Sequence, residues 1–253
     1  MNPFYFGPSE RPLYGAFTRG RSDTGGSHGV LLCYPLGSEY MRAHRAFRQL
    51  NTLLNRRGID VLRFDYSCTG DSAGAGIEAD LSTWIDDIDW AVDELRDTAL
   101  CDRVSVLGLR WGATLAALAA RERDDIEHLV LWDPIVRGPD FLEAAIGTTR
   151  PSGTVGIEGF PFTPELCEAM AEVDLASEFP DPGDAAVTVL VAEDRDDYRS
   201  VRDAVAARTP SVDYRVVPSP ADWSRADPFG DALIPQEIIQ VAVDLLDPSE
   251  DEG

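Results

Sequence analysis

A tight turn between a predicted strand and a predicted helix carries the most chemically informative residue. The segment Val104–Arg121 reads VSVLGLRWGATLAALAAR, which is an apolar strand, a Gly-x-x-x-Gly turn and an alanine-rich helix. Gly108 and Gly112 relieve crowding around the central residue of such a turn, and that residue is Arg110. A guanidinium is permanently protonated and only donates hydrogen bonds. Arg110 can therefore grip a carboxylate or an enolate, but it cannot attack an acyl carbon as a serine does.

A second segment, Gly70-Asp71-Ser72-Ala73-Gly74, matches the G-x-S-x-G pattern of serine hydrolases. Its context differs from that of a nucleophile, because the preceding strand ends near Asp65 and the next helix begins only near Asp80. We therefore expect Ser72 to lie in a packing loop.

The elements that must position these residues alternate along the chain between short β-rich runs and amphipathic helical runs. This alternation predicts an α/β fold with a mostly parallel sheet and helices on both faces. An antiparallel hairpin is expected at the start, from Phe4–Phe6 and Leu13–Thr18. Six further strands are expected at Gly29–Tyr34, Asp60–Asp65, Arg103–Leu109, His128–Trp132, Val187–Ala192 and Val212–Val217. Helices are expected at Tyr40–Asn55, after Asp80 as its cap, and at Trp111–Arg121, Thr163–Val173, Tyr198–Ala207 and Pro235–Leu246.

The segment Arg137–Pro182 breaks this alternation, since it is rich in Gly and Pro and contains only one plausible helix. We expect an inserted cap over residues 137–182, within a single domain that spans residues 1–253.

Together these features resemble the α/β-hydrolase superfamily over nearly the whole chain. CYPLG (Cys33–Gly37) stands where that family has its oxyanion loop, and FDYSCTGDSAG (Phe64–Gly74) looks like its glycine-rich loop. CYPLGSEYMRAHRAFRQL together with GLRWGATLA is most similar to serine-aminopeptidase-like and exosortase-associated hydrolases. It also resembles atypical members that lack the Ser-His-Asp triad, similar in kind to the bottromycin epimerase group. The resemblance implies the fold, whereas the chemistry depends on the site.

The resemblance assigns the triad positions residue by residue. The nucleophile position holds Arg110, and the strand-G-E-x-D pattern of the acid is matched by VLVAEDRDDY, with Asp196 first and Asp194 second. The histidine position in VPSPADW holds Asp222, and all three histidines of the chain precede residue 129. Because losing the nucleophile of such a unit costs about 10⁶-fold in rate, ordinary triad hydrolysis is not expected.

An arginine in a partly dry pocket needs an acidic partner, so we expect a salt bridge from Arg110 to a carboxylate, with Asp222 and Asp196 as the expected neighbours. In one hypothesis the bridge plugs a dead site, which leaves a ligand- or partner-binding pseudoenzyme. In another, Arg110 grips a small carboxylate- or acyl-containing substrate while Asp222 or Asp196, its pKa raised by burial, moves a proton as an epimerase or lyase would. Residual serine-type esterase or amidase activity is the third hypothesis.

Other residues complete the expected site. By resemblance, the backbone N–H groups of Leu36 and Trp111 form an oxyanion hole. Asp133 ends a strand on the functional side of the sheet and is a reserve partner for the arginine. Trp223 is a possible pocket-lining residue. His44 is expected on the apolar side of its helix, as a core or pocket-edge residue.

Composition limits the partners. The chain of 253 residues carries 45 acidic and 22 basic side chains, a formal net charge of −23, and every basic residue is arginine. This excess argues against nucleic acid and against an anionic membrane surface, and it leaves a small-molecule or peptide ligand. The bias fits either a GC-rich genome or a protein of a concentrated-salt cytoplasm. Four widely spaced cysteines predict neither a metal site nor a cofactor, and no targeting segment is evident, so a cytoplasmic location is expected.

Overall fold

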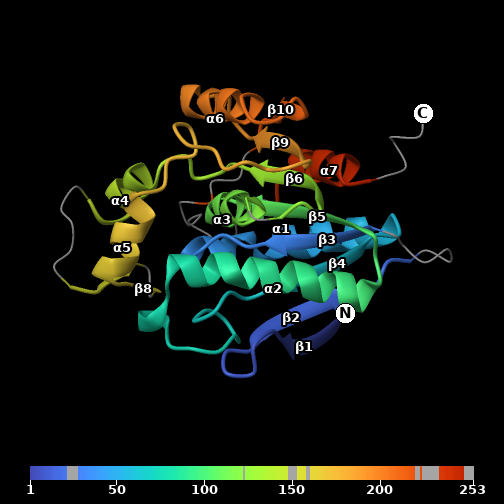
Figure 1. Cartoon of the computed structure of the whole chain (residues 1–253), viewed down its shortest axis with the longest axis horizontal. Helices are drawn as coiled ribbons and strands as arrows, with labels where there is room; N and C mark the ends of the chain where they lie inside the picture. The colour runs from blue at the N-terminus through green and yellow to red at the C-terminus, as the bar shows by residue number, and fades with distance from the viewer. Residues whose placement is uncertain are drawn as a thin grey trace.

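An eight-stranded sheet runs through the centre of the computed structural model, in the order β1-β2-β4-β3-β5-β6-β9-β10 (Figure 1). The structure describes residues 1–21, 28–121, 123–147, 153–157, 160–219, 223 and 234–247. The strands of the sheet are β1 (Asn2–Phe6), β2 (Leu13–Thr18), β3 (His28–Cys33), β4 (Asp60–Phe64), β5 (Arg103–Leu109), β6 (Ile126–Trp132), β9 (Ala186–Val191) and β10 (Val212–Val216). β2 pairs antiparallel with both β1 and β4, and all the other pairs are parallel.

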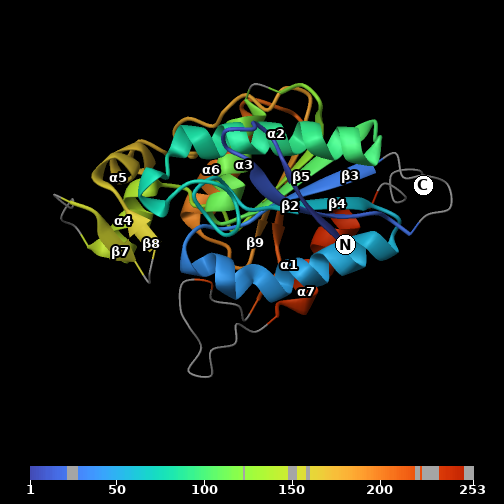
Figure 2. The same cartoon turned by 90° about the horizontal axis from the view of Figure 1, so that it is seen from below.

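Helices cover both faces of this sheet. α1 (Ser38–Arg56) and α7 (Gln236–Leu245) lie together on one face, and α2 (Leu81–Ala99), α3 (Trp111–Ala120) and α6 (Asp196–Ala206) lie on the other. Figure 2 shows the sheet between α2 on one side and the pair α1 and α7 on the other. A short 3₁₀ helix, η1 (Gly76–Glu78), precedes α2.

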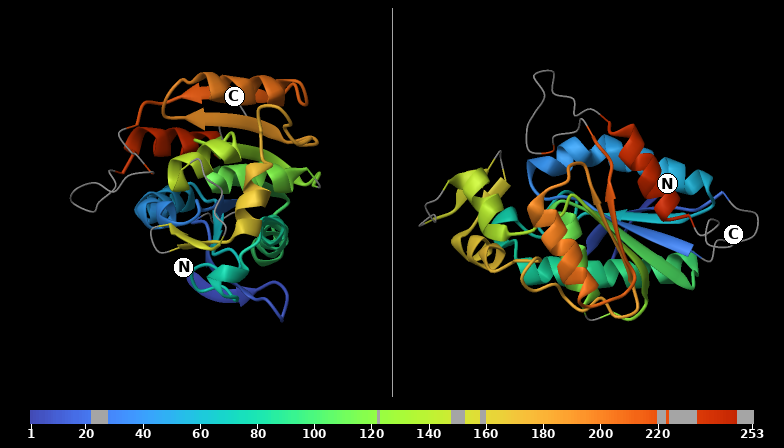
Figure 3. Two further views of the ribbon diagram at one scale, coloured as in Figure 1. Left: turned by 90° about the vertical axis from the view of Figure 1, so that its left-hand side faces the viewer. Right: turned by 90° about the horizontal axis from the view of Figure 1, so that it is seen from above.

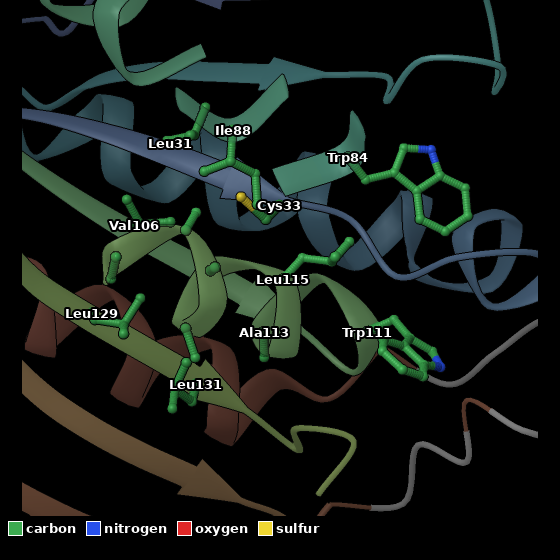
Figure 4. Close-up of a cluster of buried hydrophobic side chains, with 14 of the residues drawn as sticks. Leu31, Cys33, Trp84, Ile88, Val106, Trp111, Ala113, Leu115, Leu129 and Leu131 are labelled. Atoms are coloured by element: carbon green, nitrogen blue, oxygen red, sulfur yellow. The ribbon is translucent and has the colours of Figure 1, made fainter. Parts of the chain in front are cut away.

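The sequence explains these elements locally. Asp80 caps α2, because its carboxylate accepts a hydrogen bond of 3.0 Å from the backbone N–H of Thr83. The central parallel strands are buried on both faces, so they are continuous apolar runs rather than alternating ones. Figure 4 shows part of the resulting core, a single cluster of buried side chains that includes Ile88 of α2, Val106 of β5 and Leu129 of β6. Because these strands are parallel, their carboxyl ends lie together along one side of the sheet, which is called its carboxyl edge.

The segment between β6 and β9 contains more regular structure than the sequence led us to expect. It holds α4 (Gly138–Ile146), the hairpin of β7 (Val155–Ile157) and β8 (Phe160–Phe162), and α5 (Pro164–Ala171). Only α5 was predicted, so the expectation of a single helix was wrong. Pro139 in the first turn of α4 and Gly147 at its end were the available signals.

These four elements gather at one end of the molecule, beside the carboxyl edge of the sheet (Figures 1 and 3). The strands and helices expected elsewhere are all present, and their predicted ends are shifted by no more than a residue or two. In the part of the chain that the structure describes, no helix is long and apolar enough to cross a membrane.

Candidate functional site

The turn between β5 and α3 has the geometry that its glycines predict. Arg110 has φ 55° and ψ −122°, a strained conformation for a residue other than glycine. A Cβ on Gly108 would lie 2.3 Å from the carbonyl oxygen of Gly112, and a Cβ on Gly112 would lie 2.3 Å from the carbonyl oxygen of Cys33. Both glycines are therefore needed for the close approach of β5, α3 and β3.

Arg110 forms the expected ion pair with a carboxylate, and the partner is Glu39 in the first turn of α1. Its Nε lies 3.2 Å from Oε1 and 3.3 Å from Oε2 of Glu39, and its Nη2 lies 3.2 Å from Oε1. The side chains are only 18% and 8% exposed. Burial by itself lowers the pKa of Arg110, but the charge and hydrogen bonds of Glu39 outweigh it and raise that pKa above its usual value. The guanidinium therefore stays charged in a mostly enclosed position.

The orientation of this pair leaves part of the guanidinium available. Glu39 binds the edge formed by Nε and Nη2, and among the described residues Nη1 has no hydrogen-bond partner. Nη1 is also not among the fully buried side-chain nitrogen and oxygen atoms that lack a partner, so it retains some accessible surface. Because a guanidinium has five N–H donors, the edge of Nη1 and Nη2 can bind a second acceptor.

A cavity of about 470 Å³ lies over this pair, between the carboxyl edge of the sheet and the segment that holds α4 and the β7–β8 hairpin. Its charged lining consists of four arginines and three carboxylates: Arg42, Arg110, Arg137, Arg195, Glu39, Asp140 and Asp197. The segment after β6 contributes apolar lining: Phe141, Ala144, Ala145, Ile157 and Phe162. The cavity thus combines charged and apolar walls.

Two further arginines extend the charged part of the wall. Arg42, one turn after Glu39 in α1, donates through Nη1 to Ser38 Oγ at 3.0 Å and to the carbonyl oxygen of Trp223 at 2.9 Å. Arg195 forms an ion pair with Asp197 at the start of α6. Guanidinium groups from α1, from the turn after β5 and from the loop after β9 therefore line one cavity.

The acidic residues assigned by resemblance do not join this pair. Asp196 is the first residue of α6, its side chain is 96% exposed, and it pairs with Arg199. Asp194 is 51% exposed and accepts a 2.9 Å hydrogen bond from the Tyr214 hydroxyl, which lowers the Asp194 pKa. The expectation that these carboxylates lie beside the elbow, the turn after β5 that carries Arg110, was wrong, because the chain turns them toward solvent. Asp222 lies outside the described residues.

Asp133 and Trp223 lie nearer the elbow. Asp133 is 7% exposed, has φ 42°, and accepts a 2.8 Å hydrogen bond from the N–H of Ala192. Burial raises the pKa of Asp133, opposed by that N–H and by the charge of Arg110. Trp223 is buried and packs edge to face on Trp132 with ring centroids 5.7 Å apart. Neither residue lines the cavity, so the expectation that Trp223 lines the pocket was wrong.

Of the two residues expected to form an oxyanion hole, Leu36 lines the cavity and Trp111 does not. Trp111 begins α3 directly after Arg110, is fully buried, and has its indole ring packed on Phe141 with centroids 5.5 Å apart. In the described part of the chain, the backbone N–H of Leu36 has no acceptor, so it can donate to a ligand oxygen. The oxyanion hole itself stays a prediction.

Two other residues that the sequence singled out, His44 and Ser72, do not line the cavity. His44 is exposed and lies beside the Tyr34 ring rather than on the apolar face of α1, so the expectation of a core or pocket-edge histidine was wrong. Its position falls outside the stripe of buried residues that the 3.6-residue period of α1 sets. Ser72 is almost fully buried, accepts a hydrogen bond from the Tyr14 N–H and donates to the carbonyl of Asp65. Its hydroxyl is therefore held within the loop.

Sequence reasoning missed Glu39, although a signal was present. β3 and β5 are parallel neighbours, with Cys33 opposite Gly108 at their carboxyl ends. An acidic residue in the first turn of the helix after β3 therefore faces the residue that follows β5. The acid and histidine positions that the resemblance assigns lie far along the chain from α1, so they do not point to Glu39.

The sheet order, the strained turn after β5 and the cavity above it are those of an α/β-hydrolase fold, and the turn after β5 holds Arg110. Residues 38–152 match the family model described as Serine aminopeptidase, S33. No curated protein matches the sequence.

Solved structures support the fold. Est1E from Butyrivibrio proteoclasticus, with ferulic acid bound, has a TM-score of 0.72 at 16% identity, covering 98% of each chain. Mouse alpha/beta hydrolase domain-containing protein 10 has a TM-score of 0.64 at 20% identity, covering 100% of this chain and 99% of its own. Proline iminopeptidase from Mycobacterium smegmatis has a TM-score of 0.67 at 14% identity, covering 97% of each. At such identities the likeness concerns the fold alone.

Proposed function

We propose that this chain is a non-hydrolytic protein of the α/β-hydrolase fold that binds a small acyl compound in the cavity. Arg110 takes the place of the nucleophile and donates hydrogen bonds to the acyl oxygens. The observation that carries this proposal is the ion pair with Glu39, which holds the guanidinium by one edge and leaves Nη1 accessible. A residue held in this way recognises oxygen atoms rather than attacking carbon.

The described serines near the cavity or in a hydrolase motif give no alternative nucleophile. Ser105, whose Oγ lies 2.8 Å from Nε2 of His28, is buried and does not line the cavity. Ser38 lines the cavity, but its hydroxyl accepts a hydrogen bond from Arg42, and a guanidinium cannot remove its proton. Ser72 is enclosed by its loop. No histidine follows residue 128 in the sequence. The usual activation of serine by histidine therefore has no base in the C-terminal half of the chain.

The compared structures support the ligand class. They include an esterase from Pyrococcus furiosus, a proline iminopeptidase, and Est1E with ferulic acid bound. Esterases and peptidases act on acyl groups. A cavity in the same fold, with the backbone N–H of Leu36 on its wall and without an acceptor among the described residues, fits an acyl ligand even without a nucleophile.

A second candidate function is proton transfer at a carbon atom next to the acyl group, as in an epimerase or lyase. Its favouring observation is that Glu39 lines the cavity beside Arg110, so a carboxylate and an oxygen-binding guanidinium occupy one site. Glu39 would remove the proton while Arg110 stabilises the enolate oxygen. Glu39 thus replaces Asp196 and Asp222 as the proposed base. If no turnover occurs, the same cavity makes the chain a ligand-binding pseudoenzyme.

Two measurements test these functions on the full chain. Incubation with a fluorophosphonate probe, followed by peptide mass mapping, should leave every serine unlabelled, whereas a labelled serine would contradict the non-hydrolytic proposal. For proton transfer, NMR in D₂O should show deuterium entering the α position of an added acyl acid. That exchange should be lost in Glu39→Gln and retained in Glu127→Gln, which changes a carboxylate at the far end of the sheet. Equal exchange in both variants would exclude Glu39 as the base.

A further inference from the structure

We infer that the ligand is a free monocarboxylate with an apolar body, bound with its carboxylate at Arg110 and its body against the α4 and β7–β8 side of the cavity. This inference rests on the proposed function and specifies its ligand class. Three independent properties of the cavity support it: the donors around the elbow, the charge of the lining and the distribution of apolar side chains.

The donors at the elbow fit a group with two acceptor oxygens. The edge of Arg110 with Nη1 remains available, and the N–H of Leu36, which lines the cavity, has no acceptor among the residues the structure describes. A carboxylate offers two oxygens and no hydrogen, so it can accept from all of these groups. An ester has one strong acceptor, its carbonyl oxygen. A primary amide would bring N–H donors into a region that already contains an excess of donors.

The charges of the lining favour a ligand with one negative charge. Arg137 pairs with Asp140 and with Asp174, and Arg195 pairs with Asp197, so these guanidinium groups already have carboxylate partners. Arg110 binds Glu39 by one edge, so its other edge can bind one more carboxylate. A dianion would add a second negative charge beside Glu39, Asp140 and Asp197. Because the pair of Arg110 and Glu39 is mostly enclosed, solvent screens a ligand charge there less than it would on an open surface.

The apolar lining fixes the direction of the ligand. Phe141, Ala144 and Ala145 come from one face of α4, and Ile157 and Phe162 come from the β7–β8 hairpin. They stand apart in the chain from the elbow, on the segment between β6 and β9. An apolar body of the size of a phenylpropyl or hexyl group fits a cavity of about 470 Å³, leaving the carboxylate on the charged wall.

The test is isothermal titration calorimetry of the full chain with 3-phenylpropanoate, its methyl ester and its primary amide. The acid should bind at least tenfold more tightly than either neutral analogue. In Glu39→Gln the acid should bind several-fold more tightly still, because a competing negative charge beside Arg110 is removed. A pair with a purely structural role would not produce that gain.

Loss of the arginine is tested in two variants, so that a folding defect does not confuse the result. Arg110→Gln and the double variant Arg110→Gln/Glu39→Gln, which leaves no buried unpaired charge, should both lose at least tenfold in binding of the acid. The neutral ester should change less than threefold. The matched control is Arg103→Gln, since Arg103 begins β5 at the end away from the cavity and pairs with Glu127 at 3.6 Å. Binding of the acid should be unchanged in this control.

The outcomes separate this inference from the proposed function. Equal binding of acid and ester without hydrolysis would overturn the monocarboxylate inference and leave the proposed function standing. Hydrolysis of the ester together with fluorophosphonate labelling would overturn the proposed function. Absence of binding by 3-phenylpropanoate and by hexanoate at millimolar concentration would overturn the inference.

Discussion

Removing one member of the pair between Arg110 and Glu39 should strongly destabilise the fold. In Arg110→Met, an unbranched apolar side chain replaces the guanidinium and leaves the Glu39 carboxylate, which is 8% exposed, without its partner. Breaking a buried pair from one side costs about 3–5 kcal/mol, because an uncompensated charge stays in a poorly solvated position. For a chain of this length, 1 kcal/mol corresponds to roughly 2–4 °C in Tm, so Tm should fall by about 6–20 °C.

The double variant Arg110→Met/Glu39→Gln should recover most of this loss. Both charges are then absent, and the remaining cost is that of imperfect packing and one weakly satisfied amide, about 1–2 kcal/mol. With about 3–5 kcal/mol lost in each single variant and about 1–2 kcal/mol lost in the double variant, the cycle should give a coupling energy of at least about 4 kcal/mol. Urea denaturation followed by tryptophan fluorescence measures all four free energies of unfolding.

An exposed pair provides the control for this cycle. Arg103 and Glu127 lie 3.6 Å apart with side chains 42% and 47% exposed, and exposed pairs contribute about 0–1 kcal/mol. The cycle with Arg103→Met and Glu127→Gln should show coupling below that of the elbow pair. If both elbow changes cost less than about 1 kcal/mol and simply add in the double variant, the argument from a desolvated ion pair is refuted.

Three further predictions concern the elbow, the packing loop and pH. Arg110→Ser should hydrolyse p-nitrophenyl butyrate within threefold of the unchanged chain, since a serine without a histidine base stays weakly nucleophilic; a gain of a hundredfold would show that a base is present. Ser72→Ala should lower the free energy of unfolding by about 1–3 kcal/mol in urea titrations, because the Tyr14 N–H and the Asp65 carbonyl lose a buried partner, while ligand affinity stays unchanged. Burial, reinforced by nearby positive charges, lowers the pKa of His28 from 6.5 to about 4, so protonation favours the unfolded chain and stability present above pH 6.5 is lost as pH falls toward 4. That loss should be about 2 kcal/mol between pH 7 and pH 5 and should be absent in His28→Gln; an equal pH dependence in both proteins would contradict the assignment.

The central sheet could be predicted from the sequence because its signals are local. The run Arg103–Leu109 is predicted as a buried strand by its valine and leucine residues. The glycines at positions 108 and 112 mark the turn that follows it. Asp80 at the start of α2 is a capping residue with its acceptor at the correct spacing. Each of these patterns depends on neighbours along the chain, so one sequence is sufficient.

The partner of Arg110 could not be derived by the same route. It depends on which strand ends lie side by side, and that follows from the pairing of β3 with β5. Asp196 was assigned by its place in a motif, but here that place is the first position of α6, where the side chain faces water and Arg199. α4 was missed because the surrounding Gly and Pro residues predict loops, although Pro at a helix start and Gly at a helix end are also helix boundaries.

The turn after β5 has a practical consequence for chemical engineering of this chain. The backbone of residue 110 is imposed by Gly108, Gly112 and the strands around them rather than by its own side chain. Residue 110 is therefore a fixed attachment point. Cysteine introduced there in a background with Glu39→Gln would carry a thiol-reactive fluorophore, spin label or metal chelate to the cavity wall, turning the fold into a holder for chemistry that its own side chains do not supply.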